Sequence, residues 1–207
     1  MPTRTATLTP HPSHPVSSDL LSWSAGLGLV LALVLLPASA AAQPFASGFD
    51  ITTSASGARD VHTADIDGDG DLDVLSASID DATIAFYRNG DATSGDGDGS
   101  EWTKIEITTA ANGAESVFAA DIDGDGDQDV LSASSYNNTI SFYQNSDGDG
   151  TAWTETEITT TANGAVSVFA ADIDGDGDQD VLSASYSDDT IAFYRNGDAT
   201  SGDGDGS

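Results

Sequence analysis

The sequence contains no cysteine and very little positive charge. Its 207 residues include 35 Asp plus Glu against five Lys plus Arg, which gives a formal net charge of −30 at pH 7. The absence of cysteine excludes disulfides, thiolate nucleophiles and Cys-ligated zinc sites. The scarcity of Lys and Arg argues against nucleic acid or an anionic membrane as a partner, because both would be repelled. The excess of carboxylates is compatible with bound cations, a highly saline habitat or disorder.

Long apolar runs are also scarce, and the one that stands out lies near the N-terminus. The block Gly26–Leu36 is about as long as a signal-peptide core and too short to span a bilayer. Pro37 ends it, and Ala40 and Ala42 offer sites for cleavage. We therefore expect residues 1–42 to be a signal peptide, cut after Ala42 or Ala40, of a protein that bacteria secrete or display at the cell surface. No membrane span would remain after cleavage; an uncleaved anchor is the alternative.

The rest of the chain, residues 43–207, is built from three copies of one unit. The string ADIDGDGDLDVLSAS at 64–78 returns as ADIDGDGDQDVLSAS at 120–134 and 171–185. Between the first two copies, NGDATSGDGDGSEW stands where the next interval has the shorter NSDGDGTAW. A length change confined to a Gly/Asp-rich segment marks a surface loop. Repeats of about this length indicate supersecondary blocks that pack on their neighbours, which argues against disorder of the whole chain.

Each unit contains four short apolar runs separated by Gly, Asn and Asp turns. In the second copy they are SVFAAD (116–121), DVLSAS (129–134), TISFYQN (139–145) and WTETEIT (153–159). Runs of this length, rich in Val, Ile, Thr, Phe and Tyr, predict β-strands, and no segment after residue 42 shows a helical apolar period. We therefore predict an all-β chain of about three four-stranded antiparallel blades of a β-propeller.

The two ends of the repeat region refine this prediction. Residues 48–58 align with 104–114, so the mature chain is expected to start on the last strand of a blade. The sequence stops inside the loop that precedes the Trp-bearing strand of the third unit. Propellers typically have four to eight blades. Three blades therefore suggest part of a larger propeller, with an assembly of several chains as the alternative.

The repeated aspartate loops have the composition of a calcium site. Carboxylates stand at positions 1, 3, 5, 7 and 9, with glycines at 4 and 6. Calcium takes six to eight oxygen ligands in a flexible shell, and a glycine at position 6 allows the sharp turn that a short loop needs to surround it. The carboxylates at 1, 3, 5 and 9 can converge, while position 7 can offer its backbone carbonyl. The candidate ligands are Asp65, Asp67, Asp69, Asp71 and Asp73; Asp121, Asp123, Asp125, Asp127 and Asp129; and Asp172, Asp174, Asp176, Asp178 and Asp180.

Other interpretations of these loops fit less well. Magnesium prefers a rigid octahedron with retained waters. An EF-hand needs a Glu at position 12 and flanking helices, whereas position 12 is Ser76, Ser132 or Ser183 and the flanks are strands. A solvated, salt-adapted surface would explain the charge but not the fixed register of the carboxylates. We expect about one Ca²⁺ per repeat, three in total.

With these motifs the chain resembles the FG-GAP/VCBS repeats of bacterial exported proteins. Those repeats are similar to the calcium-binding blades of integrin alpha-subunit propellers. The resemblance covers essentially all of residues 43–207 and implies that the side chains at motif positions 1, 3, 5 and 9 and the carbonyl at 7 bind calcium within a blade. The family's propellers usually have seven blades, so this chain departs from it in number.

Several other features have simpler explanations. The second acidic segment, SGDGDGSEW at 94–102 and its counterparts, is expected to be a hairpin loop, with a weak second cation site as the alternative. Aromatic residues on the strands could form a glycan-binding surface but more often pack between blades: Trp102, Trp153, Tyr87, Tyr143 and Tyr194. His62 stands where the other units have Phe118 and Phe169 and is expected to be a tolerated substitution.

The sequence contains no motif for a catalytic centre. A nucleophile elbow, a phosphate loop and a histidine-based metal cluster are all missing from it. We therefore expect a secreted, non-catalytic binding or adhesion scaffold with an extracellular protein or glycan as its partner. One alternative is the non-catalytic propeller part of an extracellular polysaccharide lyase or hydrolase, and another is a rigid spacer.

Overall fold

The computed structural model describes residues 48–90 and 97–197, which belong to one compact unit, Ser47–Ser207. The described part of the chain consists of strands and loops and contains no helix. Among these residues there is accordingly no helix long and apolar enough to cross a membrane. The predicted signal peptide and its cleavage site lie outside the described residues.

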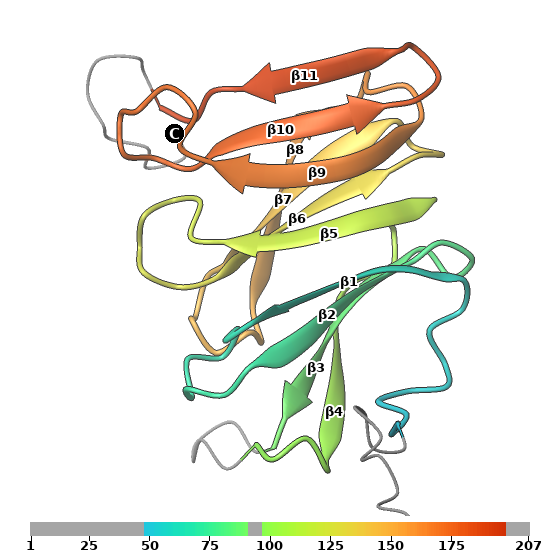
Figure 1. The fold of residues 1–207 in the computed structure, drawn as a ribbon, viewed down its shortest axis with the longest axis vertical. Helices are drawn as coiled ribbons and strands as arrows, with labels where there is room; N and C mark the ends of the chain where they lie inside the picture. Colours follow the sequence, from blue (N-terminus) through green and yellow to red (C-terminus); the bar gives the residue numbers. More distant parts are fainter. Residues whose placement is uncertain (1–47, 91–96, 198–207) are drawn as a thin grey trace, which may run out of the picture. The chain divides into compact units, whose positions relative to one another are not determined.

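The strands form three antiparallel sheets, each made of consecutive strands (Figure 1). The first contains β1 (Ala58–Ala64), β2 (Asp73–Ser78), β3 (Thr83–Asn89) and β4 (Trp102–Thr108). The second contains β5 (Ala114–Ala120), β6 (Asp129–Ser134), β7 (Thr139–Asn145) and β8 (Trp153–Thr159). The third contains β9 (Ala165–Ala171), β10 (Asp180–Ser185) and β11 (Thr190–Tyr194), three strands within the described range. The prediction of an all-β chain of antiparallel blades is confirmed.

The strand limits follow the sequence pattern closely. DVLSAS, TISFYQN and WTETEIT are β6, β7 and β8. The strand predicted at 116–121 instead runs from Ala114 to Ala120. The prediction omitted the first two residues of this strand. The register of its pairing with β6 shifts there, between Ala114 and Ser116.

The prediction of a strand at 48–58 is wrong. Residues 48–57 form no strand, and β1 begins at Ala58. A segment with this sequence pairs elsewhere with the third strand of a sheet, as β4 pairs with β3. That edge of the first sheet is already occupied by β4, so residues 48–57 have no partner strand there. Phe49, within this segment, is 83% exposed.

The sheets pack on one another through their first strands. β1, β5 and β9 lie next to one another (Figure 1). A row of tilted rings runs along them: the centroids of His62 and Phe118, and of Phe118 and Phe169, are 4.5 Å apart. His62 therefore occupies the place of a phenylalanine in this row, as expected. Within the described residues the three sheets follow one another as propeller blades do and do not close into a ring.

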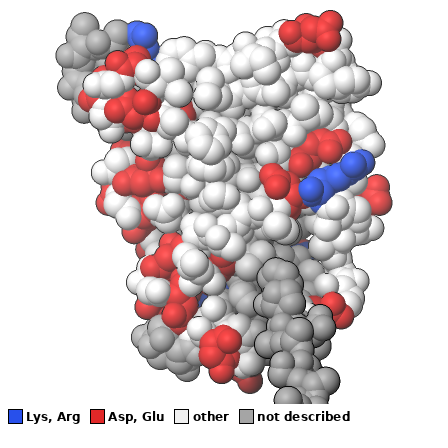
Figure 2. All heavy atoms as spheres, in the orientation of Figure 1, with Lys and Arg blue, Asp and Glu red and all other residues white. Residues whose placement is uncertain are grey.

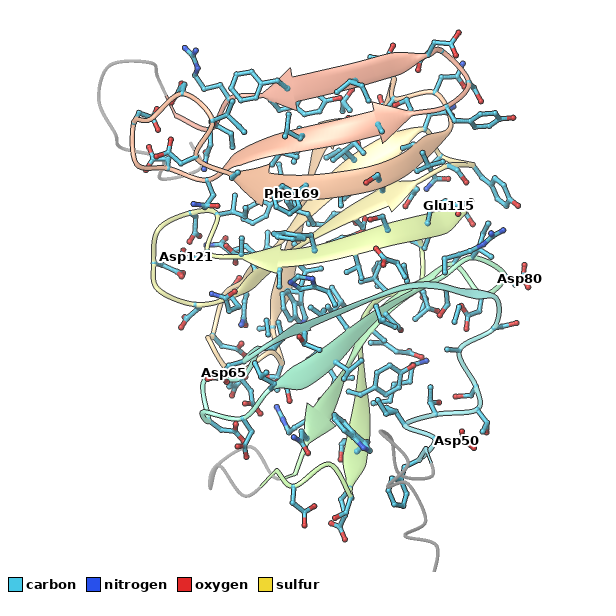
Figure 3. All side chains as sticks on the ribbon, in the orientation of Figure 1. Asp50, Asp65, Asp80, Glu115, Asp121 and Phe169 are labelled. Carbon is cyan, nitrogen blue, oxygen red and sulfur yellow. The ribbon has the colours of Figure 1, made fainter. Side chains whose placement is uncertain are left out.

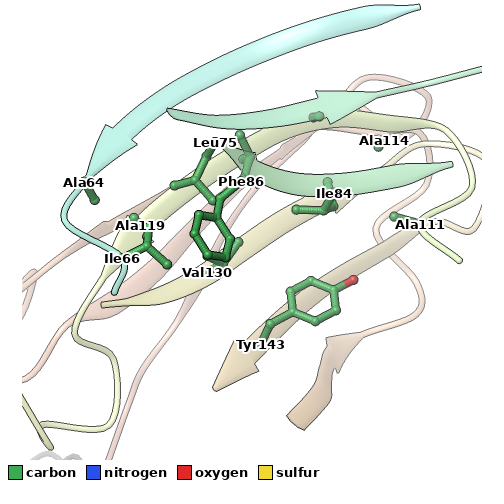
Figure 4. Packing of buried hydrophobic residues seen from close by; sticks show 12 residues of the cluster. Ala64, Ile66, Leu75, Ile84, Phe86, Ala111, Ala114, Ala119, Val130 and Tyr143 are labelled. Carbon is green, nitrogen blue, oxygen red and sulfur yellow. The ribbon is translucent and has the colours of Figure 1, made fainter. Parts of the chain in front are cut away.

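The core is divided between the two sheet-to-sheet interfaces, and equivalent residues fill both. Leu75 and Ile84 belong to the cluster between the first and second sheets, which Figure 4 shows with Phe86 and Val130. Their counterparts Leu131 and Ile140 belong to the cluster between the second and third sheets. The Ser and Ala residues of DVLSAS let the sheets approach closely, and every residue of β6 is buried. This packing fixes the ends of the strands from which the aspartate loops emerge.

Candidate metal centre

The three aspartate loops connect the first and second strands of each sheet. They span residues 65–72, 121–128 and 172–179 and are called loops 1, 2 and 3 below. All three lie at the same end of their sheets, as Asp65 and Asp121 show in Figure 3. Figure 2 shows that acidic side chains gather along this side of the repeat region.

Glycines and hydrogen bonds between residues close in sequence shape each loop. The glycine at position 6 has a φ of 99° in Gly70, 101° in Gly126 and 108° in Gly177, a conformation that favours glycine. The position-1 carboxylate accepts a hydrogen bond from this glycine's N–H in loops 1 and 2, at 3.1 Å in both. The carboxylates at positions 3 and 5 each accept one from the N–H two residues later. These bonds turn the chain sharply, as predicted.

The structure brings together the carboxylates at positions 1, 3 and 9. The groups are Asp65, Asp67 and Asp73; Asp121, Asp123 and Asp129; and Asp172, Asp174 and Asp180. Within each group, one oxygen from each residue lies within 4.8 Å of the others. These distances allow a single cation to contact all three residues. Each repeat therefore contains one acidic group that could hold a metal ion.

The aspartate at position 9 also has a structural role that the sequence did not indicate. Asp73 Oδ2 accepts a hydrogen bond from Ile66 N at 3.1 Å, and its Oδ1 accepts one from Asn89 N at 2.9 Å. Asp129 and Asp180 make the equivalent bonds with nearly the same lengths. Each of these buried carboxylates thus ties the start of its loop to the end of the third strand.

Burial makes these sites unfavourable for uncompensated negative charge. It raises the pKa of Asp73 and of Asp129 to about 6, and it also raises the pKa of Asp67 and Asp123 above the ordinary aspartate value. In loop 1, Asp65 Oδ1 and Asp69 Oδ2 are buried without a hydrogen-bond partner. A hard divalent cation would satisfy such oxygens and remove the repulsion between the carboxylates. The donor set fits calcium or magnesium.

Positions 5 and 7 do not belong to the convergent groups. Asp69, Asp125 and Asp176, at position 5, bend the loop through the hydrogen bonds described above. At position 7, the Asp71 carboxylate accepts a hydrogen bond from Gly97 N of the hairpin loop before β4, and it is not one of the carboxylates that converge in loop 1. A contribution from position 7 would then come from its main chain.

No role was predicted from the sequence for the asparagine that ends FYRN or FYQN at the third strand of each sheet. Asn145 Nδ2 donates to Ile66 O of the preceding sheet at 2.9 Å, and Asn196 Nδ2 donates to Ile122 O at 2.6 Å. Each asparagine thus links its own sheet to the aspartate loop of the sheet before it. The recurring end of this strand, FYRN or FYQN, was the available signal.

In the second copy, where the structure describes it in full, the second acidic segment is a hairpin loop, as expected; residues 94–96 and 201–207 of the other copies lie outside the described residues. Between β7 and β8, the carboxylates of Asp147 and Asp149 accept hydrogen bonds from Thr151 N at 3.3 and 3.1 Å. Thr151 Oγ1 also donates to Asp147 Oδ2 at 2.6 Å. These carboxylates hold the turn itself.

The aromatic residues of the strands pack rather than form an open surface. Trp102 Nε1 donates to Gly99 O at 3.1 Å, and Trp153 Nε1 donates to Gly150 O at 2.9 Å. Tyr87 and Tyr143 are each only 2% exposed, whereas Tyr194 is half-buried beside the core. Tyr143, Trp153 and Tyr194 belong to the clusters between the sheets, which agrees with their expected role in packing between blades.

The repeats also match a known family model. A model described as an FG-GAP-like repeat matches residues 65–132 and 121–183. Each match begins at the first aspartate of one loop and extends through the next loop into the strand after it. No curated protein matches the chain.

Proposed function

The chain belongs to the FG-GAP-like repeat family, and we propose that it is a calcium-binding β-propeller repeat protein that acts as an extracellular binding or adhesion scaffold. The observation that carries the proposal is the threefold convergence of carboxylates at motif positions 1, 3 and 9. A surface that only had to be soluble would not place one such group in each repeat at the same strand ends.

Calcium is the ion that these loops suit best. Their ligands are all oxygens, which disfavours zinc and copper. The loops are short, glycine-rich and free to adjust, whereas magnesium requires a near-ideal octahedron. The carboxylates at position 5 and the backbone carbonyls at position 7 would complete the coordination shell of an ion held by the convergent carboxylates. The bound ion would supply positive charge that the chain, with five Lys and Arg, does not have.

The chain's own residues determine what calcium would stabilise. Positions 1 and 3 follow the first strand, and position 9 is the first residue of the second strand, as Asp129 is in β6. An ion held by these residues would join two strands of one blade. Because the unfolded chain does not preform this group, calcium would favour the folded state. In a cysteine-free exported protein it would take over the part that disulfides often play.

A non-catalytic, extracellular role agrees with the remaining features. The signal-peptide pattern of residues 1–42 supports export. The clustered carboxylates occur at equivalent positions in all three repeats. Such repetition is typical of a structural framework, whereas a reaction centre would occur once. The partner of such a scaffold would be an extracellular protein or glycan. Export is tested by expressing the full chain in a bacterial host and sequencing the mature N-terminus, which is expected at Gln43, or at Ala41 for cleavage after Ala40; an N-terminus at Met1 or Pro2 would contradict it.

Calorimetric titration of the chain with calcium tests the metal proposal directly. We expect about three ions per chain. Changing Asp69, Asp125 and Asp176 together to Asn should weaken or abolish binding, because it removes one carboxylate from each loop. A matched variant with the same charge change on exposed strand and turn positions, Glu101→Gln, Glu157→Gln and Asp188→Asn, should keep all sites. Equal binding by both variants would contradict the proposal.

A further inference from the structure

The residue that contacts each aspartate loop from the end of the third strand or just beyond it is not the same in the three repeats. The residue before the linking asparagine is Arg88 in the first sheet, Gln144 in the second and Arg195 in the third. We propose that this residue ranks the calcium affinities of the loops, with loop 2 the tightest, loop 3 intermediate and loop 1 the weakest. This inference rests on the proposed calcium binding and adds to it a residue outside the ligand set that regulates each site.

All three side chains contact the same atom of the motif. Arg88 Nε lies 2.5 Å from Asp67 Oδ2, and Arg195 Nε lies 2.7 Å from Asp174 Oδ2. Gln144 Nε2 donates to Asp123 Oδ2 at 2.5 Å. The acceptor is the position-3 carboxylate, one of the three that converge in each loop. In each loop the same two positions are therefore in contact, and the loops differ in the charge of the residue that contacts position 3.

The charge of the donor acts directly on cation binding. A guanidinium removes one unit of net negative charge from the site and competes with a metal ion for the position-3 oxygen. An amide forms the hydrogen bond without adding charge. Sites of this kind tune calcium affinity through the charge of their ligands, and charges a few ångströms apart interact strongly when they are partly buried. Loop 2, with Gln144, is therefore expected to bind calcium most tightly.

The two arginines are held to different degrees. The Arg88 side chain is 13% exposed and its partner Asp67 is fully covered, whereas Arg195 is 41% exposed and Asp174 18%. Arg88 Nη2 also donates to Asp149 O of the second sheet at 2.9 Å, and its guanidinium lies 5.9 Å from the centre of the Phe86 ring. Because a covered and multiply held ion pair is screened less by water, Arg88 should oppose calcium more strongly than Arg195.

The test is calcium titration of the full chain with charge-neutralising and charge-adding variants. Arg88→Gln should tighten loop 1 by about tenfold, and Arg195→Gln should tighten loop 3 by a smaller factor. Gln144→Arg should weaken loop 2 by about tenfold. Single loops are assigned in backgrounds that carry the position-5 Asp→Asn changes in the other two loops.

The control is Arg59→Gln, which changes the net charge equally. Arg59 pairs with Glu115, 3.6 Å away and outside the aspartate loops. The Arg59→Gln variant should keep the calcium affinities of all three loops within about twofold of those of the parent chain. If Gln144→Arg does not fold, the two Arg→Gln variants decide the outcome alone.

The outcomes separate this inference from the proposed function. A tighter loop 1 in Arg88→Gln and a tighter loop 3 in Arg195→Gln, with all three affinities unchanged in Arg59→Gln, support it. A loop 1 that responds to Arg88→Gln and Arg59→Gln alike overturns the inference and leaves calcium binding intact. A parent chain that binds no calcium overturns both.

Discussion

At the scale of single residues, the aspartates of one loop have different tasks. Asp129 is buried and its two oxygens accept hydrogen bonds from the backbone N–H groups of Ile122 and Asn145. Asp125 is exposed and only turns the loop. A carboxylate at position 9 therefore supports the fold even in the absence of metal, whereas one at position 5 matters mainly when a cation is bound.

Replacing Asp129 with Ala should destabilise the chain even without metal. The buried backbone N–H groups of Ile122 and Asn145 would both lose their acceptor, at a cost of about 1–3 kcal/mol each. Asp125→Ala is the matched control and should change metal-free stability by about 0.5 kcal/mol or less. Urea unfolding in calcium-free buffer measures both, and equal stabilities of the two variants would count against the structural role of Asp129.

The same buried carboxylates predict how stability depends on pH. The folded-state pKa of Asp73 and of Asp129 is raised by burial to about 6, from an ordinary 3.8. A raised pKa gives a stabilising contribution that is complete below pH 3.8 and is lost as the pH rises through about 6. In metal-free buffer the melting temperature should therefore fall between pH 4 and pH 7. With saturating calcium, which binds the deprotonated form, this fall should shrink or reverse. A metal-free melting temperature that rises over this range would contradict the account.

At the scale of strands and sheets, the asparagine that ends the third strand connects neighbouring blades. Asn145 donates to Ile66 O of the first sheet and, at 3.3 Å, to Gln128 O of its own sheet. Asn89 makes the equivalent contact within its own sheet, to Leu72 O at 3.3 Å. Among the described residues no sheet precedes the first, so Asn89 has no counterpart of the bond to Ile66.

Asn145→Ala should therefore cost more than Asn89→Ala. Both variants lose the contacts within one sheet, but only the first leaves Ile66 O without its partner across the interface. We expect the difference to be about 1–2 kcal/mol in the free energy of unfolding. Chemical denaturation of the two variants beside the parent measures it, and equal costs would show that the bond between sheets adds no stability.

The sequence predicted the elements well where a pattern was local and repeated. DVLSAS and TISFYQN are short apolar runs bounded by turn signals, so their strands could be located from sequence alone. Residues 48–57 carry the same pattern as part of β4 but form no strand, because a strand needs a neighbouring edge that sequence similarity does not supply. Similarly, the contacts of Arg88 depend on how two sheets meet, so no spacing within one repeat revealed them.

At the scale of the whole molecule, the central question is how a chain with a net charge of −30 remains folded without disulfides. Its sheets bury two equivalent hydrophobic interfaces, which favour folding. The loops at the ends of those sheets gather carboxylates that oppose it. In the proposed account, calcium converts these repulsive groups into links between strands, so that folding and metal binding are coupled.

The most direct test of this account is the thermal unfolding of the full chain, followed by circular dichroism, in chelator and in a calcium series at constant ionic strength. The account predicts a β-type spectrum and a melting temperature that climbs with calcium and keeps climbing after the sites are filled, as ligand linkage requires. Sodium chloride at matched ionic strength should not reproduce the increase. A melting temperature that is unchanged by calcium, or that sodium raises equally, would contradict the claim that the aspartate loops are calcium sites.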